Sequence, residues 1–216
     1  MIRYYANKVI SYITYKLLLK EVNGLINVPK KGGVIVAANH TSYLDIPMMY
    51  VALLNKIGRP IRFLSKRELL KDTFFRAFTF LFEYKMNKVI IIDRENPEKN
   101  ALNEAINALK NGEVIGIYPE GTRSLTGKLQ RARTGVARLA LAAKVPVIPI
   151  GIKGTFRLMP TNTSLPKIKK IVKLNLGKPM HFEKYYDKKI NKKILEDITR
   201  KIMKEIAKLT GQKYSY

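Results

Sequence analysis

The chain has 216 residues, 46% of them hydrophobic, and a formal net charge of +25. This length suits one domain with a sizeable core, and the charge points to an anionic partner: a nucleic acid, an anionic membrane or a phosphorylated substrate. The sequence has no cysteine, which excludes disulfides and thiol catalysis, and with only two histidines a zinc or other metal site is not expected.

The first 23 residues are predicted to form an amphipathic N-terminal helix. Its apolar stripe contains tyrosines and is flanked by basic residues, but charged residues interrupt it, and a spanning helix needs about 20 mostly apolar residues. The segment also lacks the pattern of a signal peptide. Such a stripe suits a membrane interface, or it packs on the domain core; residues 24–216 are expected to form the domain itself.

Farther along the chain, β-branched apolar runs alternate with helical patterns. Strands are predicted at 34–38, 61–64, 89–92, 114–118, 147–152 and 171–176. Helices are predicted at about 43–54, 68–82, 97–109 (capped by Asn96), 135–143 and 190–209. This order favours a single α/β domain with a mostly parallel central sheet flanked by helices.

The first chemical signal is the run Asn39–Asp45, which directly follows the predicted strand 34–38. A carboxylate such as Asp45 can fix the tautomer of His40 and stabilise its imidazolium, so the pair can act as a general base. Ser42 and Asp45 also fit a capping box that starts a helix. The two interpretations are compatible, because a carboxylate on the first turn can reach back to His40.

The base has no evident enzyme nucleophile to activate. The sequence contains neither a cysteine nor a Gly-x-Ser-x-Gly elbow. We therefore expect His40 to remove a proton from a hydroxyl group of the substrate.

A second signal, Pro119 to Ser124, follows the predicted strand 114–118. In α/β sheets, ligands bind at the loops that leave the strand ends. Gly121 allows the backbone to approach such a ligand closely, and the planar guanidinium of Arg123 matches the geometry of a phosphate. Glu120 could instead form a local ion pair with Arg123. The stretch 121–128 is no nucleotide-binding phosphate loop, because its glycine spacing is one residue too long and no Ser or Thr follows the lysine.

Basic residues follow two more of the predicted strands, at Lys66 and Arg94. Each alone is typical of a solvated surface. The carboxyl ends of parallel strands share one edge of a sheet, however, so these cations are expected to converge with His40 and Arg123. One base among several cations fits a phosphorylated alcohol as substrate.

The positive charge is unevenly placed. From residue 121 to 182 there are 13 Lys or Arg and no Asp or Glu. Such a stretch indicates a surface at positive potential, suited to an anionic bilayer or to nucleic acid. No RNA-recognition signature or recognition helix is apparent.

These motifs resemble those of the glycerolipid acyltransferases, specifically the bacterial 1-acyl-sn-glycerol-3-phosphate acyltransferases. The Asn-His-x-x-x-x-Asp motif reads here as Asn39, His40 and Asp45, and Glu-Gly-Thr-Arg-Ser is intact at 120–124. A Val-Pro-Val-Ile-Pro segment lies at 145–149. The second motif is only partly kept: Lys66, Glu68 and Leu69 match, but Thr73 and Arg76 replace the usual Pro and Gly, which bears on acceptor or acyl-chain preference.

The resemblance implies that His40, oriented by Asp45, deprotonates the sn-2 hydroxyl of lysophosphatidic acid, which attacks acyl-CoA or acyl carrier protein. The residues implied for the acceptor phosphate pocket are Lys66, Arg94, Glu120, Gly121, Thr122 and Arg123. No metal or bound cofactor is expected, since the thioester is already activated. The implied product is phosphatidic acid, in phospholipid synthesis.

Anionic membrane lipids are the expected partners, with peripheral or monotopic attachment to the cytoplasmic face of the inner membrane, and no nucleic acid is expected. Three alternatives stay open: an acyltransferase for another lysophospholipid or a lyso-aminolipid, a basic nucleic-acid-binding module, and a non-catalytic scaffold at the membrane surface.

Overall fold

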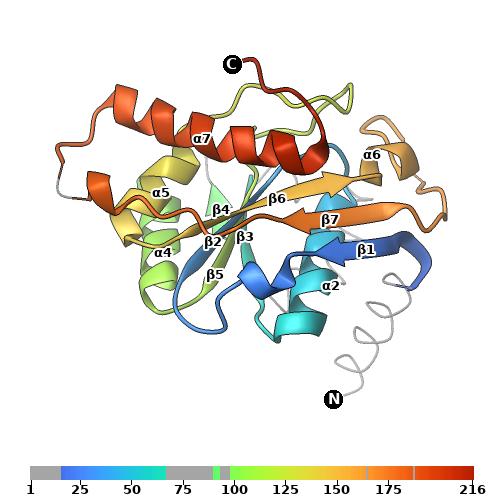
Figure 1. Ribbon diagram of the computed structural model, residues 1–216, viewed down its shortest axis with the longest axis horizontal. Helices are drawn as coiled ribbons and strands as arrows, with labels where there is room; N and C mark the ends of the chain where they lie inside the picture. The colour runs from blue at the N-terminus through green and yellow to red at the C-terminus, as the bar shows by residue number, and fades with distance from the viewer. Residues whose placement is uncertain (1–15, 67–89, 93–97, 164, 187) are drawn as a thin grey trace.

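The structure is a computed structural model that describes residues 16–66, 90–92, 98–163, 165–186 and 188–216. Within these ranges one sheet holds seven strands in the order β1-β7-β6-β2-β5-β3-β4 (Figure 1). The strands are β1 (Leu19–Asn23), β2 (Val34–Ala38), β3 (Ile61–Lys66), β4 (Ile90–Ile92), β5 (Val114–Ile117), β6 (Val147–Lys153) and β7 (Val172–Leu176). Neighbouring strands pair in parallel, except that β6 and β7 are antiparallel.

Helices cover both faces of this sheet. They are α2 (Asp45–Ile57), α4 (Glu98–Lys110), α5 (Gly135–Ala143), α6 (Thr155–Leu158) and α7 (Lys192–Thr210), with short 3-10 turns at Leu25–Asn27 and Glu183–Tyr185. One hydrophobic cluster joins the sheet to α2, and a second joins the opposite face to α4, α5 and α7. The α/β architecture expected from the sequence is therefore confirmed.

The central strand β2 is buried on both faces, which explains its continuous apolar sequence. Val34, Val36 and Ala38 belong to the cluster on the α2 side. Ile35 and Ala37 belong to the other cluster. Because β2 is fixed from both sides, it delivers the residues that follow it to a defined place at the carboxyl edge of the sheet.

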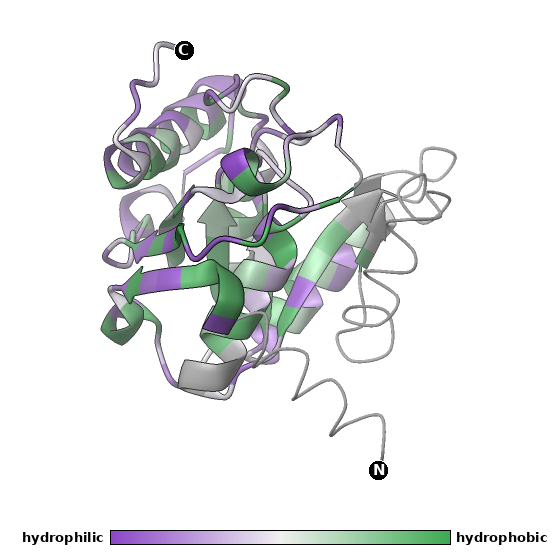
Figure 2. Ribbon diagram, turned by 90° about the vertical axis from the view of Figure 1, so that its right-hand side faces the viewer, coloured by the Kyte–Doolittle hydropathy of each residue, from purple (hydrophilic) through white to green (hydrophobic). Residues whose placement is uncertain are grey.

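The predicted strands all occur within two residues of their expected bounds. Four predicted helices occur as α2, α4, α5 and α7, while the predicted helix at 68–82 and the Asn96 cap lie outside the described residues. At α7, the side chain of Asn191 caps the helix by accepting a hydrogen bond from the Ile194 amide. Polar and apolar residues alternate around this helix (Figure 2), and its apolar stripe is buried.

The N-terminal boundary of the domain differs from the prediction. Residues 19–23 were assigned to an amphipathic helix, but they form β1, which pairs with β7. The side-chain Nδ2 of Asn23 donates to Asn175 Oδ1 at 2.9 Å, and Lys173 pairs with Glu21 at 2.6 Å. These partners lie some 150 residues away in the chain, so a local periodicity could not reveal them. The first 15 residues lie outside the described part of the chain.

In the described ranges, no helix has both the length and the apolarity needed to cross a bilayer.

Candidate active site

His40 lies two residues beyond the end of β2, at the carboxyl edge of the sheet. Its Nδ1 is 2.9 Å from Oδ2 of Asp45, the first residue of α2. The Asp45 side chain is fully buried, whereas 12% of the His40 side chain is exposed. A carboxylate can only accept, so Nδ1 carries the proton and Nε2 is left as the basic nitrogen.

The same carboxylate oxygen also shapes the turn. Asp45 Oδ2 accepts from the backbone amides of Thr41 at 2.6 Å and Ser42 at 2.8 Å. The Ser42 hydroxyl in turn accepts from the Leu44 amide at 3.1 Å. Asp45 therefore starts the helix and contacts the imidazole at once, so the contacts that the two interpretations of this run require are both present.

An aromatic ring supports the other side of the imidazole. Tyr118, the residue after β5, stacks on His40 with ring centroids 4.0 Å apart and planes 15° from parallel. Phe63 of β3 continues the stack, with its centroid 6.1 Å from that of Tyr118. Sequence reasoning missed Tyr118, whose only signal is its place directly before the loop at 119–124.

Glu120 joins the two motif segments. Its Oε1 accepts from the His40 amide at 2.9 Å, and its Oε2 accepts from the Gln130 amide at 2.8 Å. The Ser124 amide donates back to the His40 carbonyl at 2.8 Å. Burial raises the pKa of Glu120 to about 7, against the lowering effect of the hydrogen bonds from His40 and Gln130.

This arrangement corrects the prediction for Glu120. It was placed in the phosphate pocket, with an ion pair to Arg123 as the alternative, but both of its oxygens are bonded to the chain and its side chain is buried. Glu120 is therefore a positioning residue that holds the loop against His40.

Arg123 is held against the ring of Tyr43. The guanidinium carbon is 3.4 Å from the Tyr43 ring centroid, in a cation–π stack. Among the described residues, Arg123 Nη1 is buried without a hydrogen-bond partner. A buried N–H group without an acceptor is costly, so a phosphate oxygen at this point would complete the site. Tyr43, like Tyr118, was not predicted as a site residue.

The turn between Glu120 and Arg123 requires a glycine. Gly121 has a φ of 73°, in the left-handed region, and a Cβ there would lie 3.2 Å from the Arg133 side chain. Thr122 is exposed, and its carbonyl accepts from Gln130 Nε2 at 3.2 Å. A second guanidinium, that of Arg133, thus lies beside the loop.

Lys66 and Arg94 complete the predicted cation set. Lys66 is the last residue of β3 and pairs with Ile92 of β4. Its backbone therefore lies at the same carboxyl edge as His40, two strands away. The Lys66 side chain and the whole of Arg94 lie outside the described part.

The fold is that of an α/β domain, and the loops at the carboxyl edge of its sheet carry a His–Asp pair and a guanidinium held on an aromatic ring. Residues 20–153 match the family model described as Acyltransferase, and the chain belongs to that family.

The chain is similar to proteins from several bacteria. It is 28% identical over 155 residues to the 1-acyl-sn-glycerol-3-phosphate acyltransferase of Bacillus subtilis (strain 168), covering 72% of this chain and 70% of that protein. It is 31% identical over 168 residues to a probable 1-acyl-sn-glycerol-3-phosphate acyltransferase of Mycoplasma pneumoniae (strain ATCC 29342 / M129 / Subtype 1), covering 74% of this chain and 60% of that relative.

A solved structure shares the fold over nearly the whole chain. The crystal structure of the 1-acyl-sn-glycerophosphate (LPA) acyltransferase PlsC from Thermotoga maritima superposes with a TM-score of 0.69 at 27% identity. The match covers 99% of this chain and 83% of that one.

Proposed function

We propose that this chain transfers a fatty acyl group from acyl-CoA or an acyl carrier protein to the sn-2 hydroxyl of 1-acyl-sn-glycerol-3-phosphate, forming phosphatidic acid. The observation that carries the proposal is the His40–Asp45 pair, together with Arg123 on the loop that bonds to His40 through the Ser124 amide. Among the described residues, Arg123 presents a buried N–H group that lacks an acceptor. The names of the relatives support the same acceptor.

The reaction begins at Nε2 of His40, which takes the proton of the sn-2 hydroxyl. The oxygen attacks the thioester carbonyl, and a tetrahedral intermediate forms. Its collapse breaks the carbon–sulfur bond and releases the thiolate, which takes the proton from the imidazolium. Asp45 stabilises that imidazolium through Nδ1, so the residue that accepts the proton also returns it.

Arg123 holds the acceptor's phosphate in this proposal, with Lys66 and Arg94 as further cations at the same edge. The guanidinium is fixed by Tyr43, so little side-chain freedom is lost on binding. Because a thioester is an activated acyl group, the proposed reaction requires no metal ion or bound cofactor.

We place the enzyme on the cytoplasmic face of the inner membrane, attached peripherally or monotopically. The net charge of +25 supports contact with anionic lipids. Nucleic acid is not a partner in this proposal, since the His40–Asp45 pair would have no use there.

The test measures thiol release from palmitoyl-CoA by the purified chain, with and without lysophosphatidic acid. His40→Ala is expected to abolish acceptor-dependent release. His181→Ala is the matched control, because His181 is 52% exposed and pairs only with Glu183 among the described residues. Near-normal turnover in His40→Ala would contradict the mechanism.

The acceptor is tested separately by offering a lysophospholipid without a phosphomonoester and a lyso-aminolipid. We expect lysophosphatidic acid to give the highest kcat/KM, since only it presents a doubly charged phosphate to Arg123. Faster transfer to another acceptor would replace the proposed substrate. No release with any acceptor from either donor would favour the basic binding module.

A further inference from the structure

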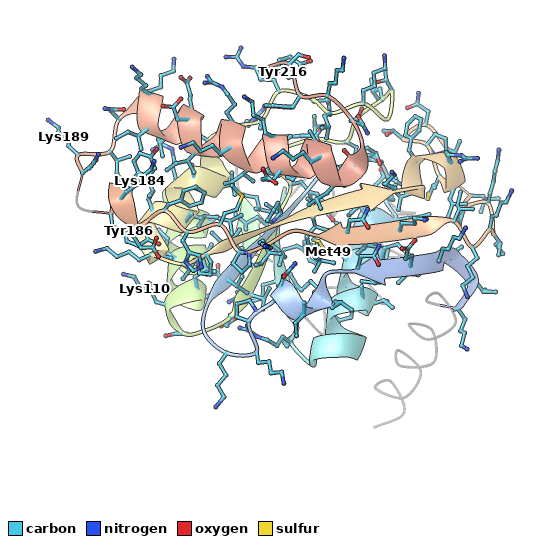
Figure 3. All side chains as sticks on the ribbon, in the orientation of Figure 1. Met49, Lys110, Lys184, Tyr186, Lys189 and Tyr216 are labelled. Carbon is cyan, nitrogen blue, oxygen red and sulfur yellow. The ribbon has the colours of Figure 1, made fainter. Side chains whose placement is uncertain are left out.

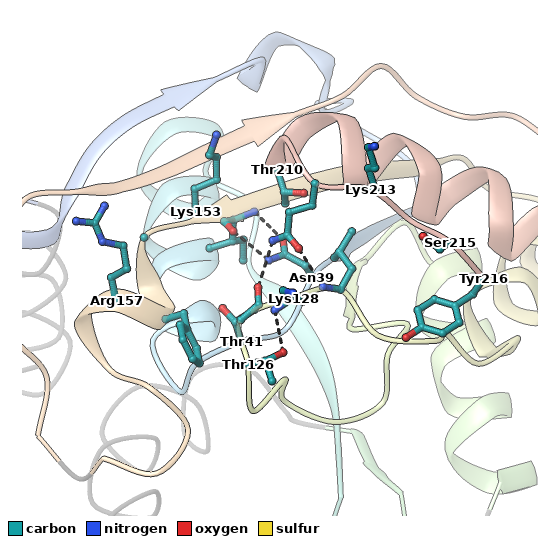
Figure 4. Close-up of a pocket in the computed structure, with 16 residues that line it drawn as sticks. Asn39, Thr41, Thr126, Lys128, Lys153, Arg157, Thr210, Lys213, Ser215 and Tyr216 are labelled. Atoms are coloured by element: carbon teal, nitrogen blue, oxygen red, sulfur yellow. Dashed lines mark hydrogen bonds between the residues drawn. The ribbon is translucent and has the colours of Figure 1, made fainter.

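A pocket of about 680 Å³ lies next to the catalytic turn (Figure 4). The His40 ring lies toward β5, because it stacks on Tyr118, the residue that follows that strand. The pocket instead faces β6, the other neighbour of β2, and is lined by Asn39 and Thr41 on either side of His40 in the chain. Its size lies in the range of small-molecule sites.

The pocket wall is basic. Lys128, Lys153, Arg157 and Lys213 line it, from three separate stretches of the chain, and the lining described in the structure includes no Asp or Glu. The hydroxyl groups of Thr41 and Thr126 add polar contacts. Four cations without a carboxylate favour an anionic ligand with several oxygens, such as a phosphate.

Specific contacts hold this wall in place. Gln212, just after α7, accepts from the Leu129 amide at 3.0 Å and donates to the Gly127 carbonyl at 3.2 Å. Gly127 has a φ of 74°, and a Cβ there would lie 2.8 Å from the ring of Phe156. The turn that carries Lys128 is thus seated on Phe156 and fastened to the end of α7, which makes this a built pocket.

Thr41 links the pocket to the catalytic pair. Its amide donates to the Asp45 carboxylate at 2.6 Å, while its hydroxyl lies 3.3 Å from that of Thr155 and lines the pocket. The pocket is therefore one residue from His40 in the chain but on the opposite side of the turn from the ring. A ligand bound there must have a long arm to reach the base.

The two substrates of the proposed reaction differ in the distance between their phosphate and their reacting group. In the acceptor, only a few bonds separate the hydroxyl from the phosphate, which suits Arg123. In the donor, a phosphopantetheine arm separates its phosphate from the thioester by roughly 15 Å when extended, at about 3.3–3.6 Å for each peptide-like unit.

We propose that this basic pocket binds the phosphate of the phosphopantetheine arm of the acyl donor. The inference rests on the proposed function, and the chemistry is common to acyl-CoA and to acyl carrier protein. Lys153 and Arg157 contact the phosphate, and the arm passes the Thr41 turn to bring the thioester to His40.

The test compares Lys153→Ala/Arg157→Ala with the wild type on three donors: palmitoyl-CoA, palmitoyl-carrier protein and palmitoyl-pantetheine, which lacks the phosphate. The control is Lys110→Ala/Lys189→Ala, which removes the same charge at the opposite end of the molecule (Figure 3). We expect the pocket variant to raise the KM for a phosphorylated donor roughly tenfold or more. The KM for palmitoyl-pantetheine and for lysophosphatidic acid should not change.

If the KM rises only for palmitoyl-CoA, the pocket binds the phosphate of acyl-CoA. If the KM rises only for the palmitoyl-carrier protein, the pocket binds the phosphate of the carrier protein's prosthetic arm. Unchanged KM values for both phosphorylated donors in an active variant would overturn the inference and leave the proposed function intact. An increase only in the KM for lysophosphatidic acid would assign the pocket to the acceptor and also overturn it. If the wild type transfers from no donor, the proposed function fails, and calorimetry with free CoA still tests the pocket.

Discussion

Two buried carboxylates organise the catalytic turn, and they do so in different ways. Asp45 Oδ2 accepts from one side chain and two amides. Within the described part of the chain, Glu120 accepts only from uncharged groups, among them the amide of His40 itself. The Asp45 carboxylate can therefore support a cationic imidazolium directly, whereas Glu120 fixes the backbone that carries the imidazole.

If Arg123 binds the acceptor phosphate, the planar shape of its guanidinium should matter for binding as well as its charge. Arg123→Lys keeps the charge but loses the stack on Tyr43 and the planar fork. We expect it to raise the KM for lysophosphatidic acid nearly as much as Arg123→Ala, by roughly tenfold or more, with the KM for the acyl donor unchanged.

Steady-state kinetics with each substrate varied in turn measures this effect. Arg138→Ala is the control, because Arg138 is exposed on α5 and lies outside the site. A KM for lysophosphatidic acid that stays at the wild-type value in Arg123→Ala would remove this residue from the phosphate site.

The raised pKa of Glu120 predicts a pH-dependent stability. Burial raises this pKa from its ordinary value of 4.5 to about 7, so the folded state binds the proton more tightly than the unfolded state. The stabilising contribution is therefore complete below pH 4.5 and is lost as the pH rises through about 7. At about 1.4 kcal/mol per pKa unit the change is at most about 3.5 kcal/mol.

Urea unfolding at pH 5, 6, 7 and 8 tests this sign by comparing the wild type with Glu120→Gln, which cannot titrate. The free energy of unfolding of the wild type, relative to that of the variant, should fall across this range. If this difference in the free energy of unfolding is constant, or grows with pH, the hydrogen bonds to Glu120 outweigh the effect of burial on its pKa.

At the scale of elements, the site depends on how closely β5 approaches β3. Gly116 of β5 lies against the ring of Phe63, where a Cβ would come within 2.5 Å of a ring carbon. Phe63 is 1% exposed and stacks on Tyr118, which stacks on His40. The absence of one methyl group in β5 thus lets the two rings of Phe63 and Tyr118 line up under the base.

Gly116→Ala is therefore expected to lower the free energy of unfolding by about 1–3 kcal/mol, the cost of overpacking a closed core. It should also lower kcat, because the ring stack must shift. Gly135→Ala, in α5, is the matched control: of the residues that the structure describes, its Cβ would meet a single atom, of Ile117, at 3.9 Å. Urea unfolding and initial rates measure both effects, and equal stability of the two variants would contradict the packing argument.

Local patterns in the sequence predict much of this architecture. The apolar run at 34–38, the turn from His40 to Asp45 and the apolar stripe of α7 depend on neighbours within a few residues, so these patterns are visible in the sequence. The His40–Asp45 contact spans five residues, which is why it could be inferred.

What the sequence did not reveal depends on distant partners. β1 is a strand only because β7 pairs with it, and Tyr118 supports His40 only because β5 lies beside β2. The burial of Glu120 follows from Gln130 and His40 closing over it. The basic pocket draws its wall from four segments that share no local motif.

At the scale of the whole molecule, charge dominates. Nitrogen-tipped side chains surround most of the outline in Figure 3, and 13 Lys or Arg with no Asp or Glu fall between residues 121 and 182. Each basic residue close to an anionic bilayer contributes about 1 kcal/mol to binding. The positive electrostatic field of so many charges favours association with any anionic surface before specific contacts form.

At about 0.1 M salt, we expect the chain to bind vesicles that contain phosphatidylglycerol at least roughly tenfold more tightly than phosphatidylcholine vesicles. Most of this preference should be lost at about 1 M salt, because the screening length falls from about 10 Å to about 3 Å. Vesicle co-sedimentation measures the partition coefficient. Equal, salt-insensitive binding to both vesicle types would show that apolar insertion governs attachment.

The direction of β1 has a consequence for how substrate is found. Because β1 runs parallel to β7 and β7 runs antiparallel to β6, Leu19 at the start of β1 lies beside Val172, near the carboxyl end of β6. The chain before Leu19 therefore leaves the domain from the edge that carries His40. An N-terminal attachment to a bilayer would tether that edge to the lipid plane, so that an acceptor could arrive by lateral, two-dimensional diffusion without being extracted into water.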